Sequence, residues 1–315
     1  MSKFPCKIYI PALLQKLQHP KPAKSQYAPH PWVVLAYGQR IQMATVDKSK
    51  KLYSKGIRRV QSIVGSLLYQ SWALDSTTTV AINKLGVEQA RATEKTRYGC
   101  DMLLDYVTIY PNPKIRFCAS DMILHVDSDA AYLVQPNAQS RYAGYYYLGS
   151  QNSTNNTLNG DVLIICRTIW NVVASAAKAE TWGLFGNGQG IIPIRRVLDA
   201  LDHPQPPTPV KTDNTTSDSF VHSNIQKRTS KTWYMRWNWL RDRETHRELK
   251  YYWAPGKEND ADYFTKNFPP NYHQKIRPNY ILKGFNLTTL HPYCGALALP
   301  SHVRGCIFPR AGKNS

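Results

Sequence analysis

Residues 122–133 read Met-Ile-Leu-His-Val-Asp-Ser-Asp-Ala-Ala-Tyr-Leu, and this stretch decides the fold. Apolar residues fill its first half, two carboxylates follow at alternate positions, and a second apolar group closes it. A short run of this composition predicts a β-strand. Because side chains at i and i+2 share one face of a strand, Asp127 and Asp129 are expected on the same face.

Further strand and helix signals surround this stretch. The expected strands are 115–119, 122–126 continuing into 130–133, 142–148, 161–166, 208–212 and 250–253. A helix is expected to begin at the N-cap Ser175, to break near 186–190 and Pro193, and to resume until about Leu201. Later helices are expected over 214–224, 230–247 and the turn 259–266. This order predicts an antiparallel meander followed by further helices and strands, a mixed α/β fold.

Composition divides the chain into four segments. Residues 1–56 are rich in Pro, Lys, Gln and His, which predicts an extended basic lead-in with one short helix over 10–17. Apolar residues at helical spacing in 57–113 predict three short helices that form a small helical subdomain. The α/β pattern occupies 114–270, and 271–315 predicts an irregular basic tail because its Pro, Asn and aromatic residues follow no period.

The chain is strongly basic, with 40 Lys and Arg against 21 Asp and Glu and a net charge of +19. Residues 1–60 hold 12 Lys and Arg and a single acid, Asp47, while no acid follows Lys266. Basic flanks around an acidic centre favour a nuclease over a simple binding protein. No apolar run reaches the roughly 18 to 20 residues of a membrane span, and the six cysteines include no Cys-x-x-Cys pair typical of zinc sites.

Four carboxylates occupy the ends of predicted strands or the starts of predicted helices. They are Asp127, Glu180, Asp213 and Asp262. In a mixed sheet, such ends can meet at one point. Grouped carboxylates repel one another unless a cation neutralises them, and Mg²⁺ prefers oxygen ligands. The pattern therefore predicts a site for divalent metal ions, of the kind that cleaves phosphodiesters.

Four ordered blocks of the sequence resemble the RNase H domain of copia-type retrotransposon polyproteins. They are His125–Ala130, Ser175–Glu180, Lys211–Asn214 and Ala261–Lys266. Upstream, Tyr37–Gln42 and Val60–Tyr69 resemble the region that joins reverse transcriptase to RNase H in the same polyproteins. The family's helix block usually has a Glu where this chain has Lys178, and the chain contains no Tyr-x-Asp-Asp polymerase motif.

The resemblance implies an RNase H-like mixed five-stranded sheet flanked by helices, with Asp127, Glu180, Asp213 and Asp262 as ligands of two Mg²⁺ or Mn²⁺ ions. It implies an endonuclease that hydrolyses the RNA strand of an RNA–DNA hybrid. A reverse-transcriptase domain of the same polyprotein is an expected partner, and a membrane is not. The expected location is intracellular, in the cytoplasm, in virus-like particles or in the nucleus.

An asparagine and several basic residues that follow the third carboxylate are expected to contact the nucleic-acid backbone. These candidates are Asn214, Lys227, Arg228, Lys231, Arg236 and Arg241. Trp233 and Trp237, four residues apart, are expected to face the core instead. Two other functions stay open. One is a catalytically inactive retroelement remnant that still binds nucleic acid, and the other is an integrase-type strand-transfer enzyme, which the early position of Glu180 disfavours.

Overall fold

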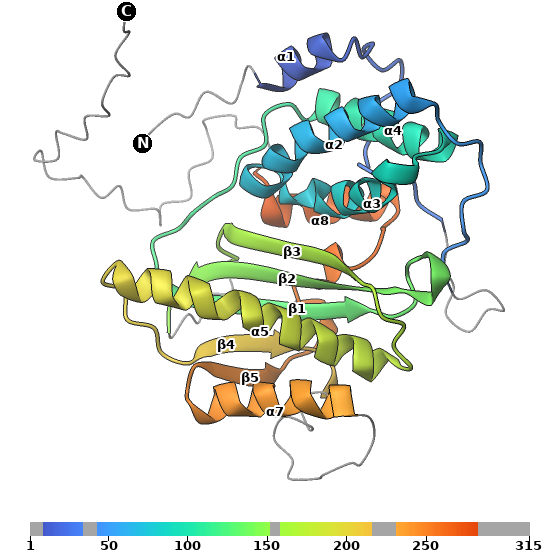
Figure 1. The fold of residues 1–315 in the computed structure, drawn as a ribbon. Coiled ribbons are helices and arrows are strands. Elements are labelled where there is room, and N and C mark those ends of the chain that lie inside the picture. The colour runs from blue at the N-terminus through green and yellow to red at the C-terminus, as the bar shows by residue number, and fades with distance from the viewer. Residues whose placement is uncertain (1–8, 34–42, 152–157, 216–230, 283–315) are drawn as a thin grey trace, which may run out of the picture. The chain divides into compact units, whose positions relative to one another are not determined.

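A mixed five-stranded sheet organises the second half of the chain (Figure 1). The computed structural model describes residues 9–33, 43–151, 158–215 and 231–282, with the side chains of 231–233 left out. The strands are β1 (Ile123–Ala131), β2 (Ser140–Gly149), β3 (Asp161–Ile169), β4 (Thr208–Thr212) and β5 (Leu249–Trp253). Their order across the sheet is β3-β2-β1-β4-β5. The first three strands are antiparallel, whereas β4 and β5 run parallel to β1, so the predicted mixed sheet is confirmed.

Helices α5 (Ala176–Ala200) and α7 (Lys231–Thr245) cover one face of this sheet (Figure 1). Alternation along β1 turns Leu124 and Val126 towards these helices, where they meet Leu184 of α5 and Leu240 of α7. Trp237 belongs to the same core, as predicted from its spacing. The odd-numbered side chains of β1, Asp127 and Asp129 among them, consequently face the opposite side of the sheet.

The expected break in the helix after Ser175 is wrong, because α5 is continuous through 186–190 and Pro193. The glycines serve close packing instead of ending the helix. A Cβ atom on Gly186 would lie 2.8 Å from the ring of Tyr142, and one on Gly188 would lie 2.8 Å from the ring of Trp239. These contacts let α5 approach both the sheet and α7, and the tertiary packing offsets the roughly 1 kcal/mol by which glycine weakens a helix.

Four helices that precede the sheet form a second core, and the last described helix, α8, packs beside them in a separate cluster with Tyr145 and Phe264. In chain order, these helices are α1 (Tyr9–Lys16), α2 (Ser54–Ala73), α3 (Thr79–Glu88), α4 (Glu94–Ile109) and α8 (Pro270–Tyr280), with the short 3-10 turn η2 (Ser76–Thr78) between α2 and α3. The three predicted helices of 57–109 correspond to α2, α3 and α4. Their apolar stripes meet in one cluster that includes Ile63, Leu67, Leu85 and Leu103. Figure 1 shows α8 among these helices, on the side of β3.

Two expectations from local sequence are wrong. Residues 115–119 form no strand, because single hydrogen bonds tie them to a neighbouring loop: Gly160 N donates to Arg116 O at 2.8 Å, and Cys118 N donates to Asn159 Oδ1 at 2.7 Å. The tail expected to be irregular begins with helix α8, which starts at Pro270, where the missing N–H costs nothing. The predicted helix 214–224 and residues 283–315 lie largely or wholly outside the described residues.

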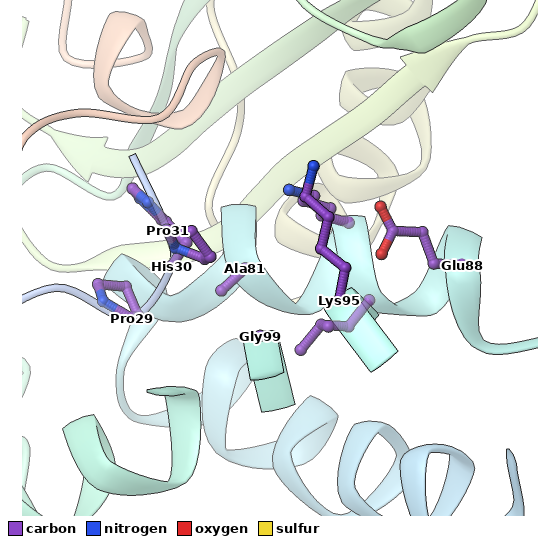
Figure 2. Close-up of a pocket in the computed structure, with 9 residues that line it drawn as sticks. Pro29, His30, Pro31, Ala81, Glu88, Lys95 and Gly99 are labelled. Carbon is purple, nitrogen blue, oxygen red and sulfur yellow. The ribbon is translucent and has the colours of Figure 1, made fainter. Parts of the chain in front are cut away.

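A short segment near the N-terminus, residues 29–31, lies against α3 (Figure 2). Its residues Pro29, His30 and Pro31 line a slot of about 20 Å³ with Ala81 and Gly99. A slot of this size holds about one water molecule, so it is no binding site for a substrate. Burial lowers the pKa of His30 to about 4, with the nearby cation of Arg141 acting in the same direction. Among the described helices, none combines the length and apolarity required to cross a membrane.

Candidate metal centre

The parallel pairing of β1 with β4 brings carboxylates from distant parts of the sequence to one level. Val126 pairs with Val210, and Asp127 pairs with Lys211. Two residues further along the same register, Asp129 lies level with Asp213, which directly follows β4. Side chains two positions apart share a face. The sheet therefore forms two successive layers on that face, Asp127 with Lys211 and then Asp129 with Asp213.

Three carboxylates form a close group at the second layer. One ligand oxygen from each of Asp129, Glu180 and Asp213 lies within 4.8 Å of the others. Asp129 and Glu180 are buried, and Asp213 is half-buried. Glu180 lies in the second turn of α5, whose start is capped by Ser175 Oγ, which accepts a hydrogen bond from Lys178 N at 3.3 Å. This cap and the close approach of α5 to β1 set the position of the Glu180 carboxylate.

Burial and mutual repulsion make the group electrostatically costly without a cation. Burial raises the pKa of Asp129 to about 7, and the neighbouring carboxylates of Asp262 and Asp213 contribute in the same direction. The pKa of Glu180 is raised by burial and then by Asp129 and Asp213. Glu180 Oε2 is fully buried and has no hydrogen-bond partner among the described residues. A divalent cation would satisfy this oxygen and remove the repulsion, so the donor set fits a hard metal ion.

Asp262 flanks the group. It begins the short 3-10 turn η6 (Asp262–Phe264), and its carboxylate forms an ion pair of 2.6 Å with Lys266. Among the carboxylates, Asp262 raises the pKa of Asp129 most. The hydroxyl of Thr265 lies 2.7 Å from Asp129 Oδ2 and 2.9 Å from the carbonyl oxygen of Asp262. This hydroxyl connects the turn to the three-carboxylate group.

The structure places Asp127 differently from the other three predicted ligands. Its Oδ2 accepts hydrogen bonds from Lys211 Nζ at 2.9 Å and from Asp260 N at 3.0 Å. Asp127 thus forms an ion pair with Lys211 through Oδ2 and does not belong to the three-carboxylate group, although its Oδ1 is buried without a partner among the described residues. Asp129, which the sequence analysis placed on the same face without a ligand role, stands in the group instead. The interval from Lys211 to Asp213 equals that from Asp127 to Asp129, but only the register of β1 against β4 shows which residues lie level.

The predicted nucleic-acid contacts are placed only in part. Asn214 directly follows the carboxylate group on the loop after β4. The guanidinium of Arg236 stacks on the ring of Trp182, with its Cζ atom 3.6 Å from the ring centroid, and burial lowers its pKa. Arg241 lies one turn further along α7 and is half-buried. The others lie outside the described residues or have no described side chain: Lys227, Arg228 and Lys231.

Comparisons with known proteins find similar solved structures at low identity. No protein-family model and no curated protein matches the chain. The N-terminal RNase H domain of a Mycobacterium tuberculosis protein, solved as a maltose-binding-protein fusion, is similar at 15% identity over 50% of this chain and 96% of that one, with a TM-score of 0.32. An RNase H1 in complex with an RNA/DNA hybrid is similar at 12% identity over 45% of this chain and 93% of that one, with a TM-score of 0.32. The foamy viral protease-reverse transcriptase in complex with an RNA/DNA hybrid is 12% identical over 71% of this chain and 27% of that chain, with a TM-score of 0.41.

The strand order and the strand directions define the fold class. Three antiparallel strands and two parallel strands form a mixed five-stranded sheet flanked by helices. The carboxylate group lies where β1 and β4, the central strand and its parallel neighbour, come together with the start of α5. Neighbouring parallel strands that end side by side are a common place for a binding site.

Proposed function

We propose that this chain is an RNase H-type endonuclease that hydrolyses the RNA strand of RNA–DNA hybrids with two divalent metal ions, Mg²⁺ or Mn²⁺. The observation that carries the proposal is the group formed by Asp129, Glu180 and Asp213, with its fully buried Glu180 oxygen that lacks a partner among the described residues. Asp262 completes the proposed ligand set from the edge of the group. Divalent cations held by such a set stabilise the charge that develops in an in-line displacement at a phosphodiester.

The residues of the chain would perform three tasks in this reaction. Asp129 and Glu180, fixed on β1 and α5, would hold the ions in a rigid frame. Asp213 and Asp262 lie on more open segments and are more accessible, so they would bind on the side that faces the substrate. Lys266 would be released from Asp262 when a metal ion binds that carboxylate, because the ion would replace the ammonium group as its counter-charge.

The basic surface would supply binding to the hybrid. The net charge of +19 favours a polyanionic partner, and guanidinium groups such as that of Arg236 can contact phosphates without reading the sequence. We further propose, from the four sequence blocks and the upstream region, that the chain belongs to a copia-type retrotransposon polyprotein. A reverse-transcriptase domain of that polyprotein would then be its natural partner.

Cleavage of a labelled hybrid in Mg²⁺ tests the proposed function. The wild-type chain is expected to cut the labelled RNA strand of the hybrid and to leave its DNA strand and a DNA duplex intact. Asp129→Asn and Glu180→Gln should each abolish cleavage, and the surface variant Glu94→Gln should retain it. A wild-type chain that binds Mg²⁺ and the hybrid but cuts neither strand would indicate an inactive remnant and would overturn the proposal.

The variant Asp127→Asn distinguishes the two possible ligand sets, one with Asp127 and one with Asp129. If Asp129 is the ligand, Asp127→Asn keeps the bound ions, and its effect is confined to stability, because Lys211 loses the charge of its partner. Calorimetric titration with Mn²⁺ measures directly whether the variant still binds the ions. Loss of Mn²⁺ binding in Asp127→Asn together with normal binding in Asp129→Asn would return the ligand role to Asp127.

A further inference from the structure

A buried network joins the helical region to the turn that carries Asp262. Arg277 of α8 forms an ion pair of 2.9 Å with Asp75, the residue before the 3-10 turn η2, and both side chains are almost fully buried. The same guanidinium donates from Nε to the hydroxyl oxygen of Tyr106 in α4 at 2.6 Å. Two separate elements of the helical region therefore hold one side chain of α8.

The network continues from α8 to the turn η6. The Tyr106 hydroxyl lies 3.0 Å from His273 Nε2, and the other ring nitrogen of His273 is hydrogen-bonded to the hydroxyl of Tyr263. Tyr263 directly follows Asp262. At the other end of the same segment, the hydroxyl of Tyr280 donates to the carbonyl oxygen of Asp260 at 2.8 Å. Helix α8 thus holds the chain on both sides of Asp262, at Asp260 and at Tyr263.

The side chain of Asp262 contributes little to fixing its own position. It is 27% exposed, and its ion-pair partner is the long and half-exposed side chain of Lys266. The turn around it is held by buried neighbours, because the ring of Tyr263 packs against Phe264 and Phe268. The position of Asp262 relative to the carboxylate group consequently depends on how α8 is anchored. It also depends on the hydrogen bonds from the Thr265 hydroxyl to Asp129 and from Asp260 N to Asp127.

We propose that Arg277 is a positioning residue for Asp262. Held by Asp75 and Tyr106, it sets α8 and, through His273 and Tyr263, the orientation of the metal-facing turn. The helical region would then be an integral part of the nuclease instead of a mere linker. This proposal rests on the proposed function only in treating Asp262 as a metal ligand. Partners that orient metal ligands typically change metal affinity by about 10-fold to 100-fold when they are mutated.

Mn²⁺ titration of the full chain tests the proposal. Arg277→Met is expected to weaken Mn²⁺ binding by roughly tenfold or more, whereas Arg277→Lys, which keeps a cation beside Asp75, should weaken it less. The matched control is Arg97→Met, which removes an exposed arginine paired with Glu94 in the same helical region and should leave Mn²⁺ binding unchanged. Circular dichroism and thermal unfolding establish that each variant is folded.

A double-mutant cycle separates positioning from general destabilisation. In an Asp262→Asn background, Arg277→Met should weaken Mn²⁺ binding no further, because both changes act through the same carboxylate. Effects that multiply in the double variant, or unchanged Mn²⁺ affinity in a folded Arg277→Met chain, would overturn the proposal. If Arg277→Met fails to fold, Tyr263→Phe takes its place in the cycle, since it removes only the hydroxyl that meets His273.

These experiments distinguish failure of the positioning role of Arg277 from failure of the proposed nuclease function. A wild-type chain that cleaves no hybrid, but shows the expected non-additive loss of Mn²⁺ affinity, refutes nuclease activity and retains the positioning role of Arg277. A chain that cleaves hybrid and shows multiplicative effects refutes the positioning role alone.

Discussion

Replacing Asp129 with asparagine should make the metal-free protein more stable above neutral pH. The pKa of Asp129 is raised to about 7 by burial and by its carboxylate neighbours, whereas an unfolded aspartate titrates near 3.8. Between these values the folded state binds more protons than the unfolded state. The contribution to stability is therefore complete below about pH 4 and is lost as the pH rises through 7.

The size of the effect follows from the same two values. The difference between about 7 and 3.8, at about 1.4 kcal/mol per pKa unit, corresponds to about 4 kcal/mol of stability lost by the wild type between pH 4 and pH 8. The asparagine side chain of the variant would carry no charge at either pH and would avoid this loss. Asp260 and Asp161, whose pKa values are also raised by burial, add to the slope of both proteins. The difference between the proteins therefore reports on Asp129 together with its repulsion of Glu180.

Urea unfolding in EDTA at several pH values, followed by tryptophan fluorescence, measures the difference. The variant should gain on the wild type by a few kcal/mol from pH 4 to pH 8, and Glu94→Gln, which alters an exposed carboxylate, should not. Adding Mg²⁺ at pH 8 should stabilise the wild type and reduce the difference in free energy of unfolding between the two proteins. A ligand that binds only the folded state raises the free energy of unfolding. A gap that stays constant from pH 4 to pH 8 in EDTA would refute the assignment of Asp129 to a repulsive cluster.

Three further perturbations test the surrounding structure. Lys211→Met leaves the carboxylate of Asp127 buried without its cation, so it should lower the free energy of unfolding by roughly 3 to 5 kcal/mol in urea titrations at pH 7, and adding Asp127→Leu should recover part of the loss. Gly188→Ala places a Cβ atom 2.8 Å from the ring of Trp239, and thermal unfolding should show a loss of about 1 to 3 kcal/mol instead of the gain usual for alanine in a helix. Arg236→Ala should weaken hybrid binding and reduce the dependence of log Kd on log salt concentration by about 1 in fluorescence-anisotropy titrations, and an unchanged salt slope would remove this residue from the interface.

Local sequence predicted most elements of the described fold. Short apolar and aromatic runs located β1, β2 and β3, and helical spacing located α2, α3 and α4. The errors arose where tertiary contacts overrode local preference. Gly186 and Gly188 indicated a helix break, yet the rings of Tyr142 and Trp239 occupy the space that side chains would have filled. Residues 115–119 have strand-like composition but, within the described part of the chain, no neighbouring strand with which to form a ladder.

The sequence by itself determined the chemical nature of the site: carboxylates at strand ends and near a helix start, in a chain of net charge +19. It also determined that Asp127 and Asp129 share a face, because alternation is a property of any strand. The different surroundings of these two side chains appear only in the tertiary structure. The register of β1 against β4 pairs Asp127 with Lys211 and leaves Asp129 level with Asp213, and a parallel register depends on how distant strands pack, which no local pattern encodes.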